Sequence, residues 1–264
     1  MCNALFIQLP LSPPPTMTHS PAFPFPPAPF TGDSREVEAG ACFDWLEQGW
    51  LLFLANPGVW VAGAALLLVM LTAVFAVSIY GQIAAHLLAP LFAAGMFQIG
   101  RQLANGGEAR IVDLFIGFRR RTGPLVMVGA IFAACVFGLA FLAFLLVTGG
   151  VLGGSVSGKV AGFGFSLGGI ALAALLVMVL SVPVIMAAWF APALVLFHDM
   201  KPLAAMRASV AAGVRNWEAM VIFAMLLTIA LFFAMLLLGL GLLLLLPVLS
   251  GAVYASYRDI FVGA

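Results

Sequence analysis

Residues 153–160 come close to the spacing of a phosphate-binding loop. They read Gly-Gly-Ser-Val-Ser-Gly-Lys-Val, against the pattern GxxxxGK[ST], and residues 194–199 resemble the apolar run that ends in a magnesium-linked aspartate. However, Val160 stands where the motif needs a hydroxyl, and no strand is expected before the loop. The two segments are also expected on opposite sides of a membrane. The sequence therefore predicts no binding of a nucleotide, and nothing in it favours a nucleic acid partner.

The remaining reactive side chains do not form a catalytic or metal-binding pattern. Cys2, Cys42 and Cys135 are too scattered for a disulfide framework or a zinc site. His86 and His198 fall at the ends of apolar segments, where a single histidine is more often a hydrogen-bonded interface residue than a ligand. No Ser/His/Asp set or carboxylate pair is expected to assemble. We expect no catalytic, cofactor-binding or metal site, and no enzyme activity.

The composition identifies a membrane protein. Of 264 residues, 64% are hydrophobic and only 8% are charged, and the mean hydropathy is +1.18. Soluble domains carry about a quarter of their residues as charged types. The fold class is therefore an all-α polytopic membrane helix bundle. Because no ionisable residue is expected at mid-membrane, an ion-coupled transporter is not favoured.

Long stretches without charge locate the spans, because a charge at the centre of a spanning helix costs about 2.5–3.5 kcal/mol. Six spans are predicted near residues 59–79, 84–103, 124–148, 170–191, 219–238 and 242–257. Between the third and fourth, nine of the 21 residues 149–169 are glycine. They predict a loop, with a re-entrant segment or close helix contact as alternatives. Gly239 and Gly241 favour a final hairpin over one long helix.

The basic residues set the expected orientation. With six spans, ten of the eleven fall on one side, and only Lys159 lies opposite. By the positive-inside rule, that side and both termini are cytoplasmic and the protein lies in the inner membrane. All ten acidic residues are expected on the same side.

Three segments on this side are amphipathic and are expected to lie at the membrane interface. Residues 108–121 carry an apolar stripe of Ile111, Leu114, Phe115 and Phe118. Residues 41–54 repeat the pattern with Phe43, Leu46, Trp50 and Phe53. Residues 202–215 form a helix with two further faces, Arg207, Ala211 and Arg215 on one, and Ala204, Ala208 and Ala212 on the other.

Two interpretations of these segments stay open. They are collars that set the depth of the spans, or they gather anionic lipid headgroups, each basic residue contributing about 1 kcal/mol near the surface. The candidate headgroup contacts are Arg110, Arg119, Arg120, Arg121, Arg207 and Arg215. The lipid bilayer, with its anionic lipids, is the expected partner, and a protein partner is also open.

Residues 1–38 predict a disordered proline-rich tail, followed by an integral membrane domain over 39–264. Pro residues crowd 10–29 and prevent a helix there, no signal peptide is expected, and Met17 offers a second start. Because no apolar periodicity ties this tail to the spans, its removal is expected to leave insertion and folding intact.

Several motifs from residue 40 onward resemble a family of uncharacterised bacterial inner-membrane proteins with several spans. They are listed in chain order: Gly40, Trp45, Gly49-Trp50, Phe53, Pro57 and Trp60; Asp113-Leu114-Phe115-x-Gly117-Phe118; Ala191-Pro192-Ala193-Leu194; Asn216-Trp217; and Tyr254-x-x-Tyr257-Arg258-Asp259. The resemblance implies no activity and no site residues.

Three functional hypotheses follow from the sequence. The leading one is a non-catalytic scaffold or accessory factor that acts through its cytoplasmic side. A channel or passive transporter for a small solute, with residues 149–169 shaping a pore or gate, is the second. A protein that binds or handles anionic lipids is the third.

Overall fold

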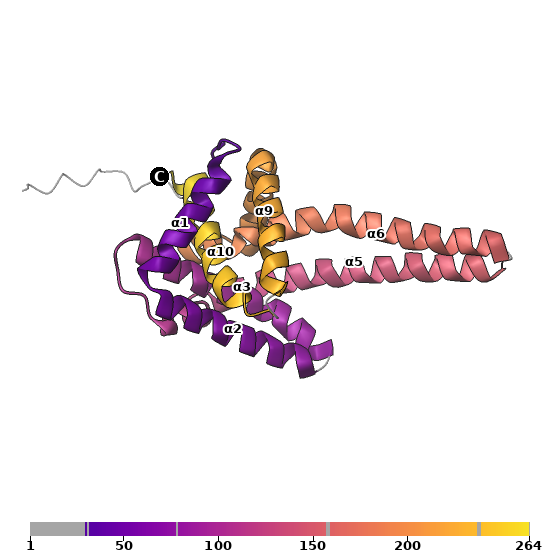
Figure 1. The fold of residues 1–264 in the computed structure, drawn as a ribbon, viewed down its shortest axis with the longest axis horizontal. Coiled ribbons are helices and arrows are strands. Elements are labelled where there is room, and N and C mark those ends of the chain that lie inside the picture. Colours follow the sequence, from indigo (N-terminus) through magenta and orange to yellow (C-terminus); the bar gives the residue numbers. More distant parts are fainter. Residues whose placement is uncertain (1–29, 31, 78, 157–158, 237–238, 264) are drawn as a thin grey trace, which may run out of the picture. The chain divides into compact units, whose positions relative to one another are not determined.

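The computed structural model describes Phe30 and residues 32–77, 79–156, 159–236 and 239–263. Over these residues the chain is helical and contains no strand, which confirms the all-α class (Figure 1). The helices are α1 (Ala41–Ala55), α2 (Pro57–Val77), α3 (Ile79–Ala104), η1 (Ile111–Phe115), α4 (Ile116–Arg119), α5 (Thr122–Val156), α6 (Lys159–Trp189), α7 (Ala191–His198), α8 (Pro202–Arg215), α9 (Trp217–Leu236), α10 (Leu242–Tyr257) and η2 (Arg258–Val262).

The compact unit begins at Gly32, earlier than the predicted domain boundary at residue 39. Residues 32–38 were assigned to a disordered tail, but they pack on the helices and hydrogen-bond to them. The sequence missed this because the segment is extended and lacks apolar periodicity. The rest of the predicted proline-rich tail, residues 1–29 and 31, lies outside the described residues.

Five helical stretches are long and apolar enough to cross a membrane. They are α2, α3, α5, α9 and the combined stretch Gly162–His198 of α6 and α7. The sixth predicted span corresponds to α10, which has 16 residues, slightly fewer than the 17–25 or so that a spanning helix needs. Its second half is enclosed by the protein, since Gly251 to Tyr257 are all buried.

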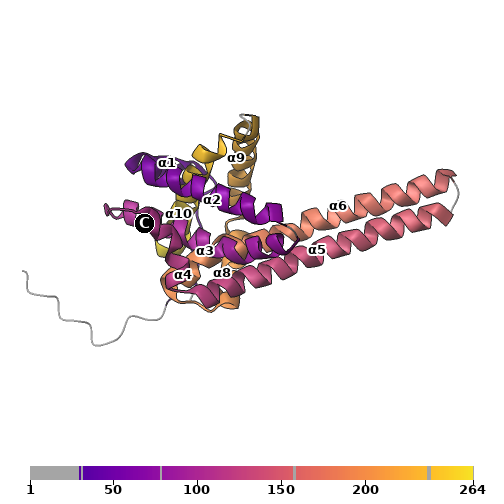
Figure 2. The same cartoon turned by 90° about the horizontal axis from the view of Figure 1, so that it is seen from below.

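The glycine-rich segment 149–169 is helical where the structure describes it, not the predicted loop. Helix α5 runs to Val156 and α6 starts at Lys159, so the two form a long antiparallel hairpin that extends away from the other helices (Figures 1 and 2). Glycines make this possible because they let the backbones touch: a Cβ on Gly150 would lie 2.9 Å from the Cα of Gly169. Gly154 and Gly162 meet even more closely. Close helix contact, one of the alternatives, is thus what these glycines provide.

The chain reverses between α9 and α10, so residues 219–257 form two helices and not one. Gly239 has a φ of +79°, a left-handed conformation that favours glycine. Its carbonyl accepts a hydrogen bond from the Leu242 N–H at 3.0 Å, which starts α10. Residues 237 and 238 lie outside the described part of the chain.

Helix α10 packs against α1, α2, α3 and α9. Its contact with α1 depends on two glycines, since a Cβ on Gly251 would lie 3.0 Å from the Gly49 Cα. The buried face of α1 is Cys42, Trp45, Gly49 and Phe53. Of the face predicted to lie at the membrane interface, only Phe53 packs inside the protein, while Phe43 and Trp50 are exposed.

Residues 108–121 form two short helical turns, η1 and α4, instead of one interfacial helix. Their apolar stripe is turned mainly toward α3: Leu114 is fully buried, and Phe118 packs on Phe92 with ring centroids 5.3 Å apart. Gly95 of α3 allows this, because a Cβ there would overlap the Leu114 carbonyl. Protein packing has thus replaced the expected lipid contact, except at Ile111, which stays exposed.

Helix α8 exposes Arg207, Ala211 and Arg215 on one face, as predicted. Its buried residues are Ala205, Met206, Ser209, Ala212 and Gly213. Of the predicted small-residue face, only Ala212 is buried, and Ala204 is exposed. The buried face of α8 is therefore rotated by about one residue around the helix axis from the predicted small-residue face.

Candidate functional site

The densest polar contacts join parts of the chain that are far apart in sequence. We call the group formed by Arg35, Trp45, Asn216 and Asp259 the junction. The Arg35 guanidinium forms an ion pair with the Asp259 carboxylate, whose other oxygen accepts a hydrogen bond from the Trp45 indole N–H at 2.9 Å. The backbone N–H of Arg35 donates to the Ile260 carbonyl at 2.9 Å. The segment before α1 is thereby fixed to the end of the chain.

Asn216, at the boundary between α8 and α9, completes the junction. It is buried, and its side-chain oxygen accepts a hydrogen bond from the Val37 N–H at 2.8 Å. Its amide group donates to the carbonyls of Arg35 and Ala212, both at 3.0 Å. Both ends of the Asn216 amide are therefore used to hold the extended segment against α8 and α9.

An aromatic cluster lies next to the junction, at the ends of α3, α7 and α10. The His198 Nε2 is 2.5 Å from the Tyr257 hydroxyl oxygen. The Phe97, Phe197 and Tyr254 rings surround Tyr257, with ring centroids 5.7–6.5 Å from it. The Arg101 guanidinium lies 4.9 Å from the centre of the Phe197 ring, a cation–π geometry.

The other histidine, His86, lies eight residues into α3 and contacts α5. Its Nδ1 is 2.7 Å from the Gln82 carbonyl, and its ring stacks on Phe132 at 5.9 Å between centroids. Over the described residues, no group of three or more His, Cys, Asp or Glu side chains is placed to hold a metal ion. The polar groups of the junction are used to connect helices.

The structure places the six candidate arginines in different surroundings. Arg121 forms an ion pair with Asp199, which joins the start of α5 to the loop before α8. Arg119 and Arg120 precede it and are exposed, as is Lys201, two residues after Asp199. These five residues form the basic cluster of the loop ends, and the Arg121–Asp199 contact is what brings them together.

The other three candidates do not join the basic cluster through any described contact. Arg207 and Arg215 lie on the exposed face of α8, and the Arg215 guanidinium donates to the Ser34 carbonyl. Arg110 is exposed, 3.9 Å from the equally exposed Glu108. The backbone N–H of Arg110 donates a hydrogen bond to the Asp113 carboxylate at 2.8 Å. This contact stabilises the first turn of η1, which follows Arg110.

Sequence reasoning gave no role to Arg35, Trp45, Asn216 or Asp259, although the last three stand in the motifs that carried the resemblance. One signal was present. Residues 41–54 were expected to have one apolar and one polar face, and Trp45 does not fit this pattern. It lies between Asp44 and Glu47, on the polar face. A tryptophan on a polar face indicates a buried indole with a hydrogen-bond partner.

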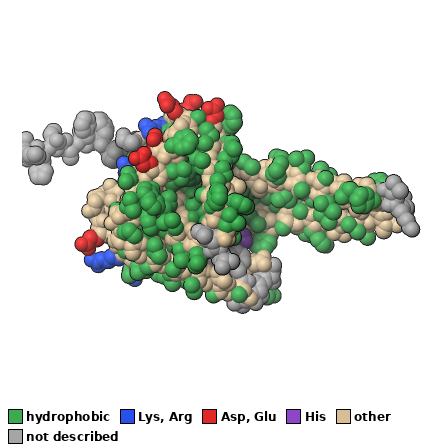
Figure 3. Space-filling model, in the orientation of Figure 1, with side chains coloured by type: hydrophobic (Ala, Val, Ile, Leu, Met, Phe, Trp, Pro, Cys, Tyr) green, Lys and Arg blue, Asp and Glu red, His purple; other side chains and the backbone are tan. Residues whose placement is uncertain are grey.

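The charged side chains visible in Figure 3 lie on the bundle and not on the described part of the α5–α6 hairpin. They form two groups, one over α1 and the neighbouring helix ends and one at a separate corner of the bundle. The described surface of that hairpin is apolar on all sides, with Phe141, Phe144 and Phe163 more than 60% exposed. This division is typical of a protein with one polar membrane face and lipid-exposed helices.

Comparison with known proteins agrees with this division. No family model matches the chain, and no solved structure matches it. The chain is 30% identical, over 199 residues, to a probable inner membrane protein of Burkholderia thailandensis, and the match covers 72% of this chain and 73% of that relative. At this identity and coverage, the chain belongs to the same family of bacterial inner membrane proteins.

Proposed function

We propose that the protein is a non-catalytic scaffold or accessory factor of the inner membrane, which acts through its charged face. The observation that carries the proposal is the junction. Its ion pair and hydrogen bonds bring residues 34–37, the start of α1, the α8–α9 boundary and η2 into one rigid surface. A fixed surface assembled from both ends of the chain suits binding to another protein.

The proposed orientation places this face and both termini in the cytoplasm. Ten of eleven basic residues support it through the positive-inside rule, provided that α10 counts as a sixth crossing. A reporter active only in the cytoplasm should work when fused after Ala264, and should fail when inserted within residues 153–158. If the reporter fails after Ala264, the orientation is wrong.

Affinity purification from native membranes in a mild detergent, followed by mass spectrometry, tests the scaffold role. Because Glu36 and Glu38 are exposed in the segment held by the junction, replacing both with Gln should remove partners that bind this face without opening the junction. A matched control is Glu108→Gln, an exposed carboxylate in the loop before η1. If no protein is enriched by the parent chain, or if the variant and control recover the same set, the proposal fails.

Anionic-lipid binding is a second candidate, favoured by the basic cluster of the loop ends. Arg119, Arg120 and Lys201 are exposed there, while Asp199 is occupied by Arg121. Near a charged membrane each free basic residue contributes about 1 kcal/mol of attraction. The channel hypothesis has less support, because the glycines assigned to a gate instead close the gap between α5 and α6.

Replacing Arg119 and Arg120 with Gln should weaken retention of anionic lipids without changing topology. The loss of up to about 2 kcal/mol corresponds to roughly thirtyfold at most in relative affinity. Native mass spectrometry of parent and variant in the same detergent measures it. Replacing Arg110 and Arg207 together with Gln removes two exposed charges outside the basic cluster and is the charge-matched control. Equal retention in parent and variant would remove lipid binding from consideration at this cluster.

A further inference from the structure

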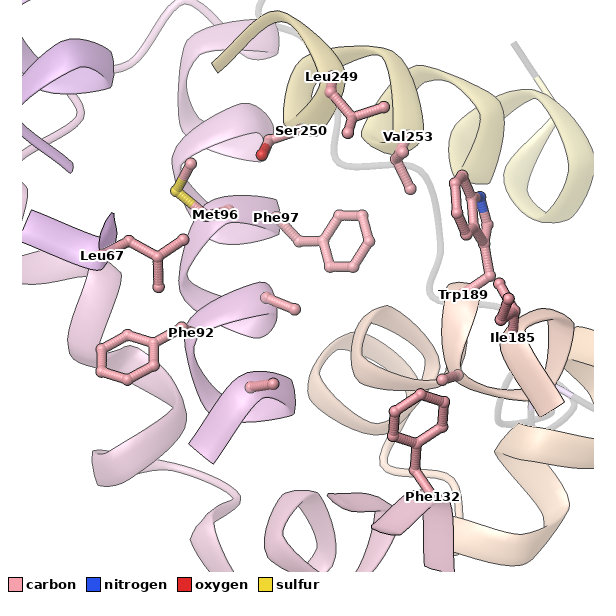
Figure 4. A pocket seen from close by; sticks show the side chains of 13 residues that line it. Leu67, Phe92, Met96, Phe97, Phe132, Ile185, Trp189, Leu249, Ser250 and Val253 are labelled. Atoms are coloured by element: carbon pink, nitrogen blue, oxygen red, sulfur yellow. The ribbon is translucent and has the colours of Figure 1, made fainter. Parts of the chain in front are cut away.

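A cavity of about 340 Å³ lies between five helices, α2, α3, α5, α6 and α10. Figure 4 shows side chains from α3, α5, α6 and α10 around an open centre, with Phe97 extending into it from α3. Apart from the Ser250 hydroxyl and the Trp189 indole, the lining side chains are apolar. A volume of this size falls in the range of ligand pockets, which begins at about 300 Å³.

Small side chains on two facing helices leave this space open. Ala89 and Ala93 face it from α3, and Ala188 faces it from α6. Larger rings stand on either side, such as Phe132 of α5. Ile185, also in the wall, is 49% exposed, so the cavity reaches the outer surface of the bundle beside α6.

The lining residues lie near the middle of α2, α3 and α10, and on α6 they lie in the last turn, within the apolar stretch Gly162–His198 that continues through α7. Leu67 is the central residue of α2, and Ala93 is close to the centre of α3. Phe132 is ten residues after the start of α5, a rise of about 15 Å, half of a hydrocarbon core of about 30 Å. The mouth of the cavity therefore faces hydrocarbon, not water.

We propose that this cavity is a binding site for the acyl chain of a membrane lipid, which enters beside α6. Water is a poor occupant, because an apolar cavity offers it few hydrogen-bond partners and stays dry. An ion or polar solute would lose its hydration with little in return. A hydrocarbon chain has no hydrogen bonds and no hydration shell to lose, and it gains contacts with the surrounding side chains. Acyl chains are also the solvent that surrounds the protein at this depth. This site is independent of the scaffold role and of the basic cluster.

Photo-crosslinking in nanodiscs tests the site on the full chain. The probe is a trace of phosphatidylethanolamine with a diazirine midway along one acyl chain, and crosslinked peptides are mapped by mass spectrometry. In the parent protein we expect crosslinks within 89–97 of α3 or 249–253 of α10, together with crosslinks on the exposed surface of α5 and α6. The latter serve as an internal reference for lipid around the protein.

Filling the cavity should remove only the first set of crosslinks. We expect Ala93→Phe to lower the ratio of cavity to surface crosslinks by roughly tenfold. Ala188→Phe fills the same space from α6 and keeps the test decisive if Ala93→Phe does not fold. The matched control is Ala174→Phe, an exposed position about four turns away on α6, which should leave the ratio unchanged.

Two results would overturn the proposal. One is the absence of crosslinks to the α3 and α10 lining in the parent, with surface crosslinks present. The other is an unchanged ratio in a folded filling variant, judged by gel filtration against the parent. A filling variant that loses the crosslinks, while Ala174→Phe keeps them, supports the site.

Discussion

The α5–α6 hairpin and the bundle around α10 hold apolar helices together in different ways. In the outer part of the hairpin, backbone meets backbone at Gly150, Gly154, Gly162 and Gly169. Around α10, a glycine contact at Gly49 and Gly251 is combined with the junction, where Trp45, Asn216 and Asp259 connect distant segments by polar contacts.

The difference follows from the number of neighbours that each region must position. In lipid there is little hydrophobic drive to bring helices together, so close packing and hydrogen bonds decide the arrangement. The outer part of the hairpin consists of two neighbouring antiparallel helices, which need only one close interface. Helix α10 has α1, α2, α3 and α9 around it. Because α1 carries charges, polar contacts at the C-terminal end of α10 can fix the positions of these neighbours. Substitutions in the bundle should therefore have wider effects than the same substitutions in the hairpin.

The largest effect is expected for Gly95→Ala in α3. The new Cβ would overlap the Leu114 carbonyl, which is backbone and has little room to move because Leu114 is fully buried. Overpacking of this kind costs about 1–3 kcal/mol and occasionally more, and here we expect the upper end, about 3 kcal/mol. Thermal unfolding in detergent, together with the yield of monodisperse protein, measures the loss.

Gly138→Ala is the matched control in the hairpin. A Cβ on Gly138 meets no atom within 4 Å among the described residues, and the residue lies mid-helix in α5. We expect a change within about 1 kcal/mol, since alanine is the better helix former. Equal destabilisation by the two substitutions would show that α3 and η1 are not in close contact.

The second prediction concerns the segment before α1. Deleting residues 1–29 should lower the free energy of unfolding less than deleting residues 1–38, which should lower it by about 2–3 kcal/mol. The longer deletion removes Arg35 and Val37, so the buried Asn216 amide and the Asp259 carboxylate lose partners. A buried polar group left without a hydrogen bond accounts for the cost. Thermal unfolding of the two truncated chains in the same detergent checks this, and equal midpoints would contradict it.

Much of the fold could be predicted from the sequence, because apolar length and charge placement are local properties. The observed starts of α2, α9 and α10 lie within two residues of the predicted spans. The error at 149–169 has a physical cause: in water glycine disfavours helix, but between two helices in lipid it permits contact that other residues would block. The same glycine pattern therefore favours a loop in water and close helix contact in lipid.

The junction could not be predicted, because its members are far apart in the chain. Arg35 and Asp259 are separated by 224 positions, and neither belongs to a periodic pattern. The candidate arginines were chosen by charge alone, and the structure gives three of them partners: Asp199 for Arg121, the Ser34 carbonyl for Arg215 and the exposed Glu108 for Arg110. Sequence shows where charges occur but not which other group neutralises each one.

The smallest global effect is expected for Gly154→Ala, near the free end of the hairpin. Its Cβ would overlap the Gly162 carbonyl oxygen, a clash nearly as severe as the one at Gly95. Here, however, the ends of α5 and α6 can separate locally, because no other described helix encloses this end of the hairpin (Figures 1 and 2). We expect a cost of about 1 kcal/mol or less in global stability, since local opening near an end involves few contacts.

The change should instead appear as a longer distance between the two helix ends. Spin labels on cysteines at Leu152 and Leu167, both exposed, report that distance after the native cysteines, including the exposed Cys135, are replaced by serine. Gly153→Ala is the neighbouring control, because a Cβ there meets no atom within 4 Å in the described structure. A wider distance distribution for Gly154→Ala alone, with an unfolding midpoint close to that of the parent, is the expected result. If Gly154→Ala lowers the midpoint as much as Gly95→Ala, the hairpin and the bundle unfold as one unit, and the contrast between local and distributed packing does not hold.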